Sequence, residues 1–224
     1  MPSKNSIKQY TENSYYHIYN RGVEKRKIFL DEQDYGVFLS YLKEYLLSKD
    51  EKDLLNQLSI PTISAQERDR VLKKLRLNNF ADEITLLAYC LMPNHFHFFI
   101  KQKNEKSIDK FMNSLLTRYT MYFNKKYKRV GALYQDVYKA VTVDREDQFL
   151  YLTKYIHKQA LKTHKRQPSS LPDYLGNRKT EWVHPEEILA YFSKTKPSLS
   201  YKDFLDLEES EDLLTIQDLM IDIK

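Results

Sequence analysis

The sequence predicts an α+β protein built around an antiparallel sheet. Two strand-like runs, "EITLLAYCLM" and "HFHFFIKQ", are joined only by Pro93 and Asn94, and this turn chemistry predicts a hairpin. Strand-like and helix-periodic segments alternate around the hairpin without the strict βα order of a parallel sheet. With 224 residues, 42% of them hydrophobic, the chain can bury a sizeable core as one elaborated domain or two small ones.

A strand and a helix are expected before the hairpin. Residues 15–20, "YYHIYN", alternate as a strand does, and the glycine-bearing basic loop "RGVEKRKIF" follows. Asp31 then has the position of an N-cap. Apolar residues next recur at helical spacing, which predicts a helix from about Glu32 to about Ser48.

The segment 49–80 separates this helix from the hairpin. Its residues are charged and irregularly spaced, unlike those of the flanking elements. One helix is expected in it, opened by Ser64 and Glu67 as a capping box. We therefore interpret the segment as an insertion.

Three more elements are expected after the hairpin. A helical period runs from Ile108 to about Tyr127, and "ALYQDVYKAVTV" is strand-like. Asp144 has the position of a cap for a third helix, "EDQFLYLTKYIHKQALKTH". The order β, α, β, β, α, β, α predicts a ferredoxin-like split βαβ, an antiparallel sheet with helices on one face, followed by a helical C-terminal extension.

Charge is distributed unevenly, although the net charge is only +5. Residues 101–166 hold sixteen Lys or Arg against six Asp or Glu, whereas residues 199–224 hold two Lys against eight acids. The basic, tyrosine-rich middle fits a polyanion, because cations neutralise phosphates and aromatic rings stack on unpaired bases. The alternative is a solvated basic helix face.

The sequence gives no sign of secretion or membrane insertion. Cys90 is the only cysteine, so no internal disulfide can form and a reducing compartment is expected. The N-terminal "MPSKNSIKQY" lacks the apolar stretch of a signal peptide, and no run approaches the roughly 20 apolar residues of a membrane helix. We therefore expect a soluble cytoplasmic protein without a membrane partner.

His95 and His97 stand one residue apart in the second strand of the hairpin. Side chains alternate along a strand, so both histidines project from one face while Phe96 and Phe98 project into the core under the helices. Two imidazoles on one face could share a metal ion, or they could be polar residues on a solvated face.

The third expected helix carries a candidate for a further ligand. Tyr151, Tyr155 and Gln159 lie at i, i+4 and i+8, hence in one row. If that row lies over the histidines, Gln159 would complete a His, His, Gln metal site with Tyr155 one turn away. The alternative is core packing by the tyrosines, and spacing alone leaves both open.

Four segments taken in order resemble a known family. "YHIYNRGVEKRKIFLDEQDYGVFL", "LLAYCLMPNHFHFFI", "TRYTMYFNKKYKRVGALYQDVYKAVTV" and "YLTKYIHKQAL" resemble the single-tyrosine HUH transposases, IS200-like, and more narrowly their REP-associated branch. The resemblance spans residues 14–164, a transposase domain with the insertion 49–80. It leaves 165–224 as an acidic accessory tail.

The resemblance implies a metal-dependent DNA strand transferase. His95, His97 and Gln159 would bind a divalent ion, Mg²⁺ or Mn²⁺, and Tyr155 would be the nucleophile. The enzyme would cleave and rejoin single-stranded DNA at or near hairpins, REP-like or insertion-sequence ends, through a 5′-phosphotyrosine. Dimers with exchanged tyrosine helices occur in the wider family, so monomer and homodimer both stand as alternatives.

Basic residues in two loops are the expected DNA contacts. They lie in the first loop and at the end of the second helix, where a solvated basic loop is the alternative. These residues are Arg21, Lys25, Arg26, Lys125, Lys126, Lys128 and Arg129.

The sequence departs from the REP-associated pattern at three places. Gln159 and Ala160 stand where relatives have Asn followed by Pro, and Val137 stands where an Arg after "WQG" is usual. The insertion 49–80 is longer than the usual connection. Gln and Asn both offer a carbonyl oxygen, so the departures concern DNA specificity rather than the chemistry.

Several alternatives stand beside this reading. Tyr119 and Tyr122 fit the apolar stripe of the second helix and are interpreted as core or base-stacking groups rather than nucleophiles. Cys90 as a zinc ligand lacks paired-cysteine spacing. The alternative functions are a transposase derivative that binds structured DNA or RNA without cutting it, and a partner-binding role of the acidic tail.

Overall fold

The computed structural model describes residues 10–162, 167–192 and 200–207. Its centre is a four-stranded antiparallel sheet with the order β2-β3-β1-β4. The strands are β1 (Tyr15–Arg21), β2 (Ile84–Met92), β3 (His95–Gln102) and β4 (Lys139–Val143). The predicted hairpin is confirmed as β2 and β3, and so is the α+β class.

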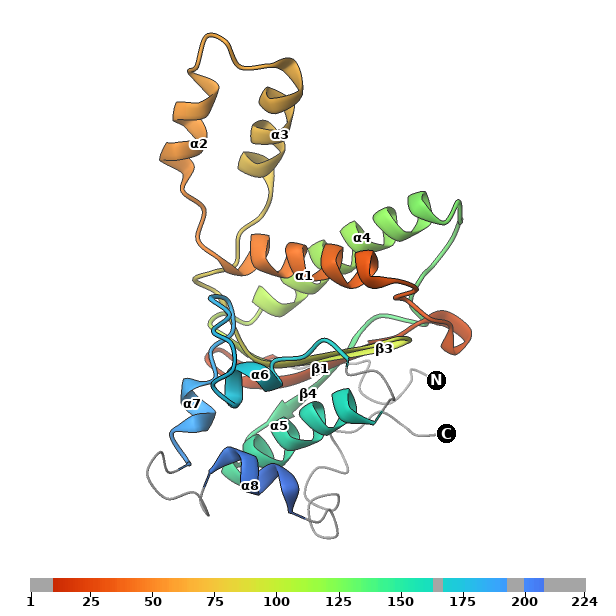
Figure 1. Ribbon diagram of the computed structural model, residues 1–224, viewed down its shortest axis with the longest axis vertical. Coiled ribbons are helices and arrows are strands. Elements are labelled where there is room, and N and C mark those ends of the chain that lie inside the picture. The colour runs from red at the N-terminus through yellow and green to blue at the C-terminus, as the bar shows by residue number, and fades with distance from the viewer. Residues whose placement is uncertain (1–9, 163–166, 193–199, 208–224) are drawn as a thin grey trace.

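Helices α1 (Glu32–Leu46) and α4 (Ser107–Lys126) cover one face of the sheet (Figure 1). α1 leads from β1 to β2 and α4 from β3 to β4, and in each case a third strand lies between the two connected strands. Asp31 caps α1, as predicted, because its side chain accepts a hydrogen bond from the backbone N–H of Asp34 at 3.0 Å.

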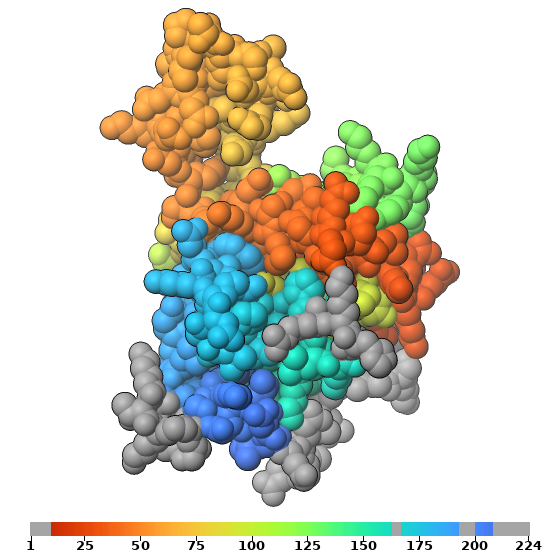
Figure 2. Space-filling model, viewed as in Figure 1, coloured from red at the N-terminus to blue at the C-terminus, as the bar shows by residue number. Residues whose placement is uncertain are grey.

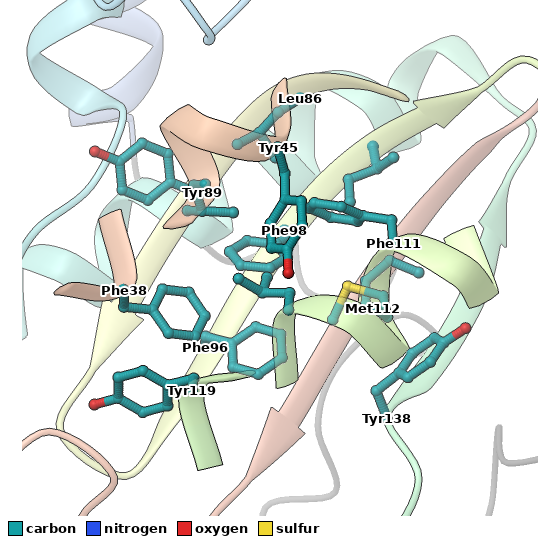
Figure 3. Close-up of a cluster of buried hydrophobic side chains, with 14 of the residues drawn as sticks. Phe38, Tyr45, Leu86, Tyr89, Phe96, Phe98, Phe111, Met112, Tyr119 and Tyr138 are labelled. Atoms are coloured by element: carbon teal, nitrogen blue, oxygen red, sulfur yellow. The ribbon is translucent and has the colours of Figure 1, made fainter. Parts of the chain in front are cut away.

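The main hydrophobic core lies between the sheet and these two helices (Figure 3). Phe96 and Phe98 of β3 are fully buried in it. Phe38 of α1 packs on both rings, and Tyr119 of α4 packs edge-on against Phe38 with ring centroids 4.9 Å apart. Burying each such side chain contributes about 1.5–3 kcal/mol. The predicted direction of Phe96 and Phe98 is confirmed, so the alternate residues of β3 face the other side of the sheet.

Helix α5 (Glu146–Leu161) covers that other side (Figure 1). Leu152 and Ile156 of α5 are fully buried there in a second core that includes Phe99 of β3 and Cys90 of β2. The predicted helices on one face are confirmed as α1 and α4, and α5 adds a cover on the other face that this fold prediction did not include. The physical reason is that β2 is buried along both of its sides, so the second face of the sheet also requires a cover.

The C-terminal extension adds short helices to this second core. They are α6 (Leu171–Tyr174), α7 (Glu186–Leu189) and α8 (Tyr201–Asp206). His157 of α5 connects them, because its Nδ1 lies 2.6 Å from the Tyr201 hydroxyl and its Nε2 2.8 Å from the Ser170 hydroxyl. The extension is thus fastened to the back of α5.

The segment 49–80 forms a helical arm that projects from the body (Figures 1 and 2). It consists of two helices packed on each other, α2 (Glu51–Leu58) and α3 (Ala65–Arg76). The sequence predicts only the second, whose Ser64–Glu67 capping box is confirmed. α2 escapes prediction because its eight residues are fewer than the roughly 10–12 over which a helical period can be recognised.

Two predictions next to β4 are wrong. The sequence predicts a strand over 132–143, but β4 covers only its last five residues. Before it, Tyr134 makes an isolated bridge to Gly22, and the chain runs as a loop. Asp144 does not cap α5, since the N-cap position belongs to Arg145, which makes no capping hydrogen bond.

No helix among the described residues is long and apolar enough to cross a membrane. Residues 163–164 of the predicted third helix and the acidic residues from 208 onward lie outside the described ranges. The division of the chain at residues 164 and 165 stays a prediction.

Candidate active site

The two histidines of β3 lie on the sheet face that α5 covers. The ring centroids of His95 and His97 are 5.0 Å apart, with the ring planes nearly perpendicular. His97 is fully buried and His95 is partly buried. The solvated-face alternative is therefore wrong for His97, because α5 excludes water from it.

A third histidine, His17 of β1, completes this cluster. Its Nε2 lies 2.9 Å from Nδ1 of His97, and the two rings stack at 14° with centroids 5.1 Å apart. His17 is itself fully buried. Sequence reasoning does not single it out, because the contact depends on the register between β1 and β3, which are distant in the chain. The one available signal is the alternation of residues 15–20, which places His17 on one strand face.

Hydrogen bonding leaves one nitrogen of each β3 histidine available as a ligand. The amide NH₂ of Asn94 donates to the Lys25 carbonyl, so the Asn94 atom that lies 2.6 Å from Nδ1 of His95 is its Oδ1. Because this oxygen can only accept, Nδ1 of His95 carries the proton and Nε2 carries a lone pair. Nδ1 of His97 is bonded to His17, whereas its buried Nε2 has no hydrogen-bond partner among the described residues. A buried imidazole nitrogen without a hydrogen-bond partner, on a ring whose other nitrogen is hydrogen-bonded, is typical of a histidine that binds a metal ion.

Both imidazoles are held in the neutral form. Burial, together with the positive charge of Arg21, lowers the pKa of His95 to about 4. Burial also lowers the pKa of His97 well below its usual value, and the neighbouring histidines and Arg21 add to this. Because neutral imidazole is the metal-binding form, both side chains could act as ligands at neutral pH.

Helix α5 places Tyr155 over these histidines. Its ring centroid lies 5.4 Å from that of His97, edge-on, and the side chain is only 8% exposed. Burial raises the pKa of the Tyr155 hydroxyl, while the positive charge of Arg21 and a hydrogen bond with Gln159 act in the opposite sense. Gln159, one turn along α5, is buried as well. The structure thus brings His95, His97, Tyr155 and Gln159 into one layer between β3 and α5.

The donors in this layer fit a divalent ion. Within the described ranges, no group of three or more His, Cys, Asp or Glu side chains could hold a metal. A third protein ligand beside His95 and His97 would therefore be of another type, such as the side-chain oxygen of Gln159. The zinc alternative gains no support, because Cys90 is buried and burial raises the pKa of its thiol, which disfavours the thiolate.

Other tyrosines considered for the chemistry are engaged elsewhere. Tyr119 lies in the main core and donates its hydroxyl to a backbone carbonyl at 2.7 Å. Tyr122 donates to Asp34 at 3.1 Å. Tyr151, the first member of the row on α5, packs against Phe204 of α8 with ring centroids 5.7 Å apart. Tyr155 is the member of the row that packs against the histidine rings.

The basic residues of the first loop do not share one environment. Arg21 is the last residue of β1 and pairs with His95 across the sheet, so it lies at the site rather than in the loop. Lys25 is exposed in the 3₁₀ turn η1 (Val23–Lys25), and Arg26 pairs with Glu24 at 3.0 Å.

The basic residues at the end of α4 are also divided. Lys126 is held by Asp31 and Asp34, each with a shortest contact of 2.7 Å, and Asp34 is fully buried. Arg129 donates to Asn124 at 3.1 Å. The contacts of Lys126 fasten the end of α4 to the start of α1. The residues that remain exposed here are Lys125 and Lys128.

Comparison with known proteins gives a family match and several distant structural matches, among them the two that follow. The family model described as "Transposase IS200 like" matches residues 60–159, which contain all four residues of the layer between β3 and α5. No curated protein matches the chain. A structure of a REP-associated tyrosine transposase bound to a REP hairpin is 11% identical, covers 87% of this chain and 94% of its own, and has a TM-score of 0.47. A putative transposase from Deinococcus radiodurans R1 is 16% identical, covers 71% of this chain and 98% of its own, and has a TM-score of 0.27.

Proposed function

Since residues 60–159 match the family model described as "Transposase IS200 like", we propose that the chain belongs to this family and is a metal-dependent single-stranded DNA transposase. It cleaves and rejoins DNA at or near hairpins through a 5′-phosphotyrosine intermediate. The observation that carries this proposal is the position of Tyr155. Its ring lies 5.4 Å from that of His97, whose buried Nε2 has no hydrogen-bond partner among the described residues.

His95, His97 and Gln159 would hold the divalent ion. Two imidazole nitrogens and one amide oxygen form a mixed donor set, which suits Mn²⁺ somewhat better than Mg²⁺, since Mg²⁺ prefers oxygen ligands. When bound, the ion would polarise the phosphodiester and offset its negative charge. The hydrogen bonds of His95 to Asn94 and of His97 to His17 orient the two rings.

Tyr155 supplies the nucleophilic oxygen. This oxygen forms a bond to the phosphorus as the bond from the phosphorus to the 3′-oxygen breaks. Because burial raises the pKa of the hydroxyl, its proton leaves as the new bond forms rather than beforehand. The departing 3′-oxygen takes up a proton and becomes a 3′-hydroxyl.

The reverse reaction joins DNA without ATP. The 5′-phosphotyrosine is still a phosphodiester, so the energy of the cleaved bond is retained. Attack by the 3′-hydroxyl of a second strand forms a new DNA phosphodiester and returns Tyr155 to its hydroxyl form. The pair of steps constitutes strand transfer.

The fold and the surface support the same function. The strand order and the placement of α1 and α4 on one face fit a ferredoxin-like split βαβ arrangement, which leaves the other face of the sheet for the site. We propose hairpins of the REP-like or insertion-sequence type as substrates. The exposed Lys25, Lys125 and Lys128 would contact the DNA backbone. Residues 14–164 would form the transposase domain, and 165–224 an accessory tail.

Covalent capture of DNA tests the proposal. Native protein is incubated with a labelled pool of single-stranded DNA hairpins in the presence of Mn²⁺ or Mg²⁺, and the products are separated on a denaturing gel. We expect a protein–DNA adduct that requires the metal ion and that disappears with Tyr155→Phe.

The matched control is Tyr151→Phe, one turn away on the same helix, which should leave the adduct unchanged because Tyr151 packs against Phe204. An adduct that survives Tyr155→Phe would show that another residue is the nucleophile. Hairpin binding by native protein without any adduct would favour a non-catalytic DNA-binding protein instead.

A further inference from the structure

Two cations flank Tyr155 in the candidate active site. Arg21 ends β1 opposite His95, on the strand face that also carries His17 and therefore on the side of α5. Lys162 follows α5 as its C-cap residue, and its Nζ lies 6.0 Å from the centroid of the Tyr155 ring. One cation thus approaches the tyrosine from the sheet and the other from the helix.

Neither cation has an anionic partner among the described residues. In the part of the chain that the structure describes, no Asp or Glu forms an ion pair with Arg21 or Lys162, and the buried Nε of Arg21 has no hydrogen-bond partner. Two partly buried cations elsewhere do have an anionic partner: Lys126 pairs with Asp34, and Arg118 pairs with Glu44. Arg21, which is also partly buried, differs from these two in having no anionic partner among the described residues, whereas Lys162 is exposed at the end of α5.

An unpaired cation beside candidate metal ligands is unfavourable on two counts. A buried guanidinium N–H without an acceptor loses its hydrogen bonds to water, and a positive charge near His95 and His97 repels an incoming divalent ion. Both penalties disappear when an anion lies between the cations and the ion. A phosphodiester next to Tyr155 is an anion of the required size, with two non-bridging oxygens to share between its partners.

We propose that Arg21 and Lys162 bind the non-bridging oxygens of the phosphodiester that Tyr155 attacks, and that they thereby couple metal binding to DNA binding. The proposal rests on the proposed function. It goes beyond a general contact with the DNA backbone, because a lysine on the other side of the sheet, such as Lys125 of α4, adds affinity without influencing the metal ion. Only charges next to the metal-binding side chains make the binding of the metal ion and the binding of DNA depend on each other.

The test measures Mn²⁺ affinity with and without DNA. The full chain carrying Tyr155→Phe, in which cleavage is blocked, is titrated with Mn²⁺ and followed by electron paramagnetic resonance, alone and with a saturating pool of single-stranded DNA hairpins. We expect DNA to tighten Mn²⁺ binding about tenfold or more, within the usual range of coupling between two sites. The added double substitution Arg21→Gln and Lys162→Gln should reduce this factor to about twofold or less.

Mn²⁺ affinity without DNA separates this role from structural damage. It should stay the same or become tighter in the double variant, because two repelling charges are gone, whereas a damaged site would bind Mn²⁺ more weakly. Lys110→Gln removes one exposed charge on α4, across the sheet, and should leave the coupling intact. Arg21→Lys keeps the charge and should retain part of the coupling.

Each outcome decides the proposal. Coupling that persists in the double variant, or that is absent while Arg21 and Lys162 are intact, overturns the phosphate-binding role. Weaker Mn²⁺ binding by the double variant without DNA would also overturn it. The adduct assay, carried out in proteins that keep Tyr155, tests the proposed function separately. If the double variant forms the adduct at an unchanged rate, only the role of the two cations is refuted.

Discussion

Replacing His17 with phenylalanine should weaken metal binding more than it disturbs the fold. Phenylalanine keeps a planar ring at the place where His17 stacks on His97 at 14°, but it cannot form the 2.9 Å hydrogen bond to Nδ1 of His97. A buried polar group left without a partner costs about 1–3 kcal/mol. For a chain of this length the melting temperature would then fall by about 2–12 °C.

The effect on metal binding follows from the tautomer of His97. With His17 in place, the hydrogen bond at Nδ1 fixes the ring, so that Nε2 can hold a lone pair toward the ion. Losing such an orienting partner typically costs about 10–100-fold in metal affinity, or about 1.4–2.7 kcal/mol. We expect Mn²⁺ affinity to fall by this factor in the His17→Phe protein.

Electron paramagnetic resonance titration with Mn²⁺ measures the affinity, and thermal unfolding measures the stability of the same samples. The matched control is His184→Phe, which changes an exposed histidine outside the cluster and should alter neither quantity. If His17→Phe lowers the melting temperature but leaves Mn²⁺ affinity within about twofold of native, His17 only packs and the orienting role is refuted.

Two further predictions concern stability. Lys126→Met removes the cation that pairs with fully buried Asp34 at 2.7 Å, and it should lower the free energy of unfolding in urea by about 2–4 kcal/mol. The loss is somewhat smaller than for a fully buried ion pair because Lys126 is 21% exposed. An unchanged urea concentration at the unfolding midpoint would show that water replaces the lysine. Burial lowers the pKa of His157 to about 3, below its unfolded value of about 6.5, so the unfolded chain binds more protons between these pH values. The contribution of neutral His157 to the free energy of unfolding is fully present above about pH 6.5 and is lost by up to about 1.4 kcal/mol per pH unit as the pH falls toward 3. The free energy of unfolding of the His157→Leu protein should therefore fall less steeply than that of native protein between about pH 7 and 5. Equal slopes for the two proteins would contradict this prediction.

The sequence by itself determined the features that depend on neighbouring residues. Caps such as Asp31 and Ser64 act within three residues, so their helices begin where the sequence predicts. Strand alternation is equally local, and it placed His95 and His97 opposite Phe96 and Phe98. The family resemblance of the chain also rests on such local segments in order. The two candidate ligands on β3 and the row that includes Tyr155 could therefore be named before the structure.

Only the tertiary structure decided what surrounds these residues. β1 pairs with β3 in a register that brings His17 beside His97 and Arg21 beside His95, and neither contact can be read from spacing because the strands are far apart in the chain. The packing of α5 against the second sheet face likewise decided that the site is buried, which the prediction of helices on one face did not provide. Hydrogen-bond partners, burial and unpaired charges are properties of this assembled layer, since each needs atoms from at least two elements. Local pattern can nominate the reacting groups, but the electrostatic environment that would make them reactive arises only when β1, β3 and α5 meet.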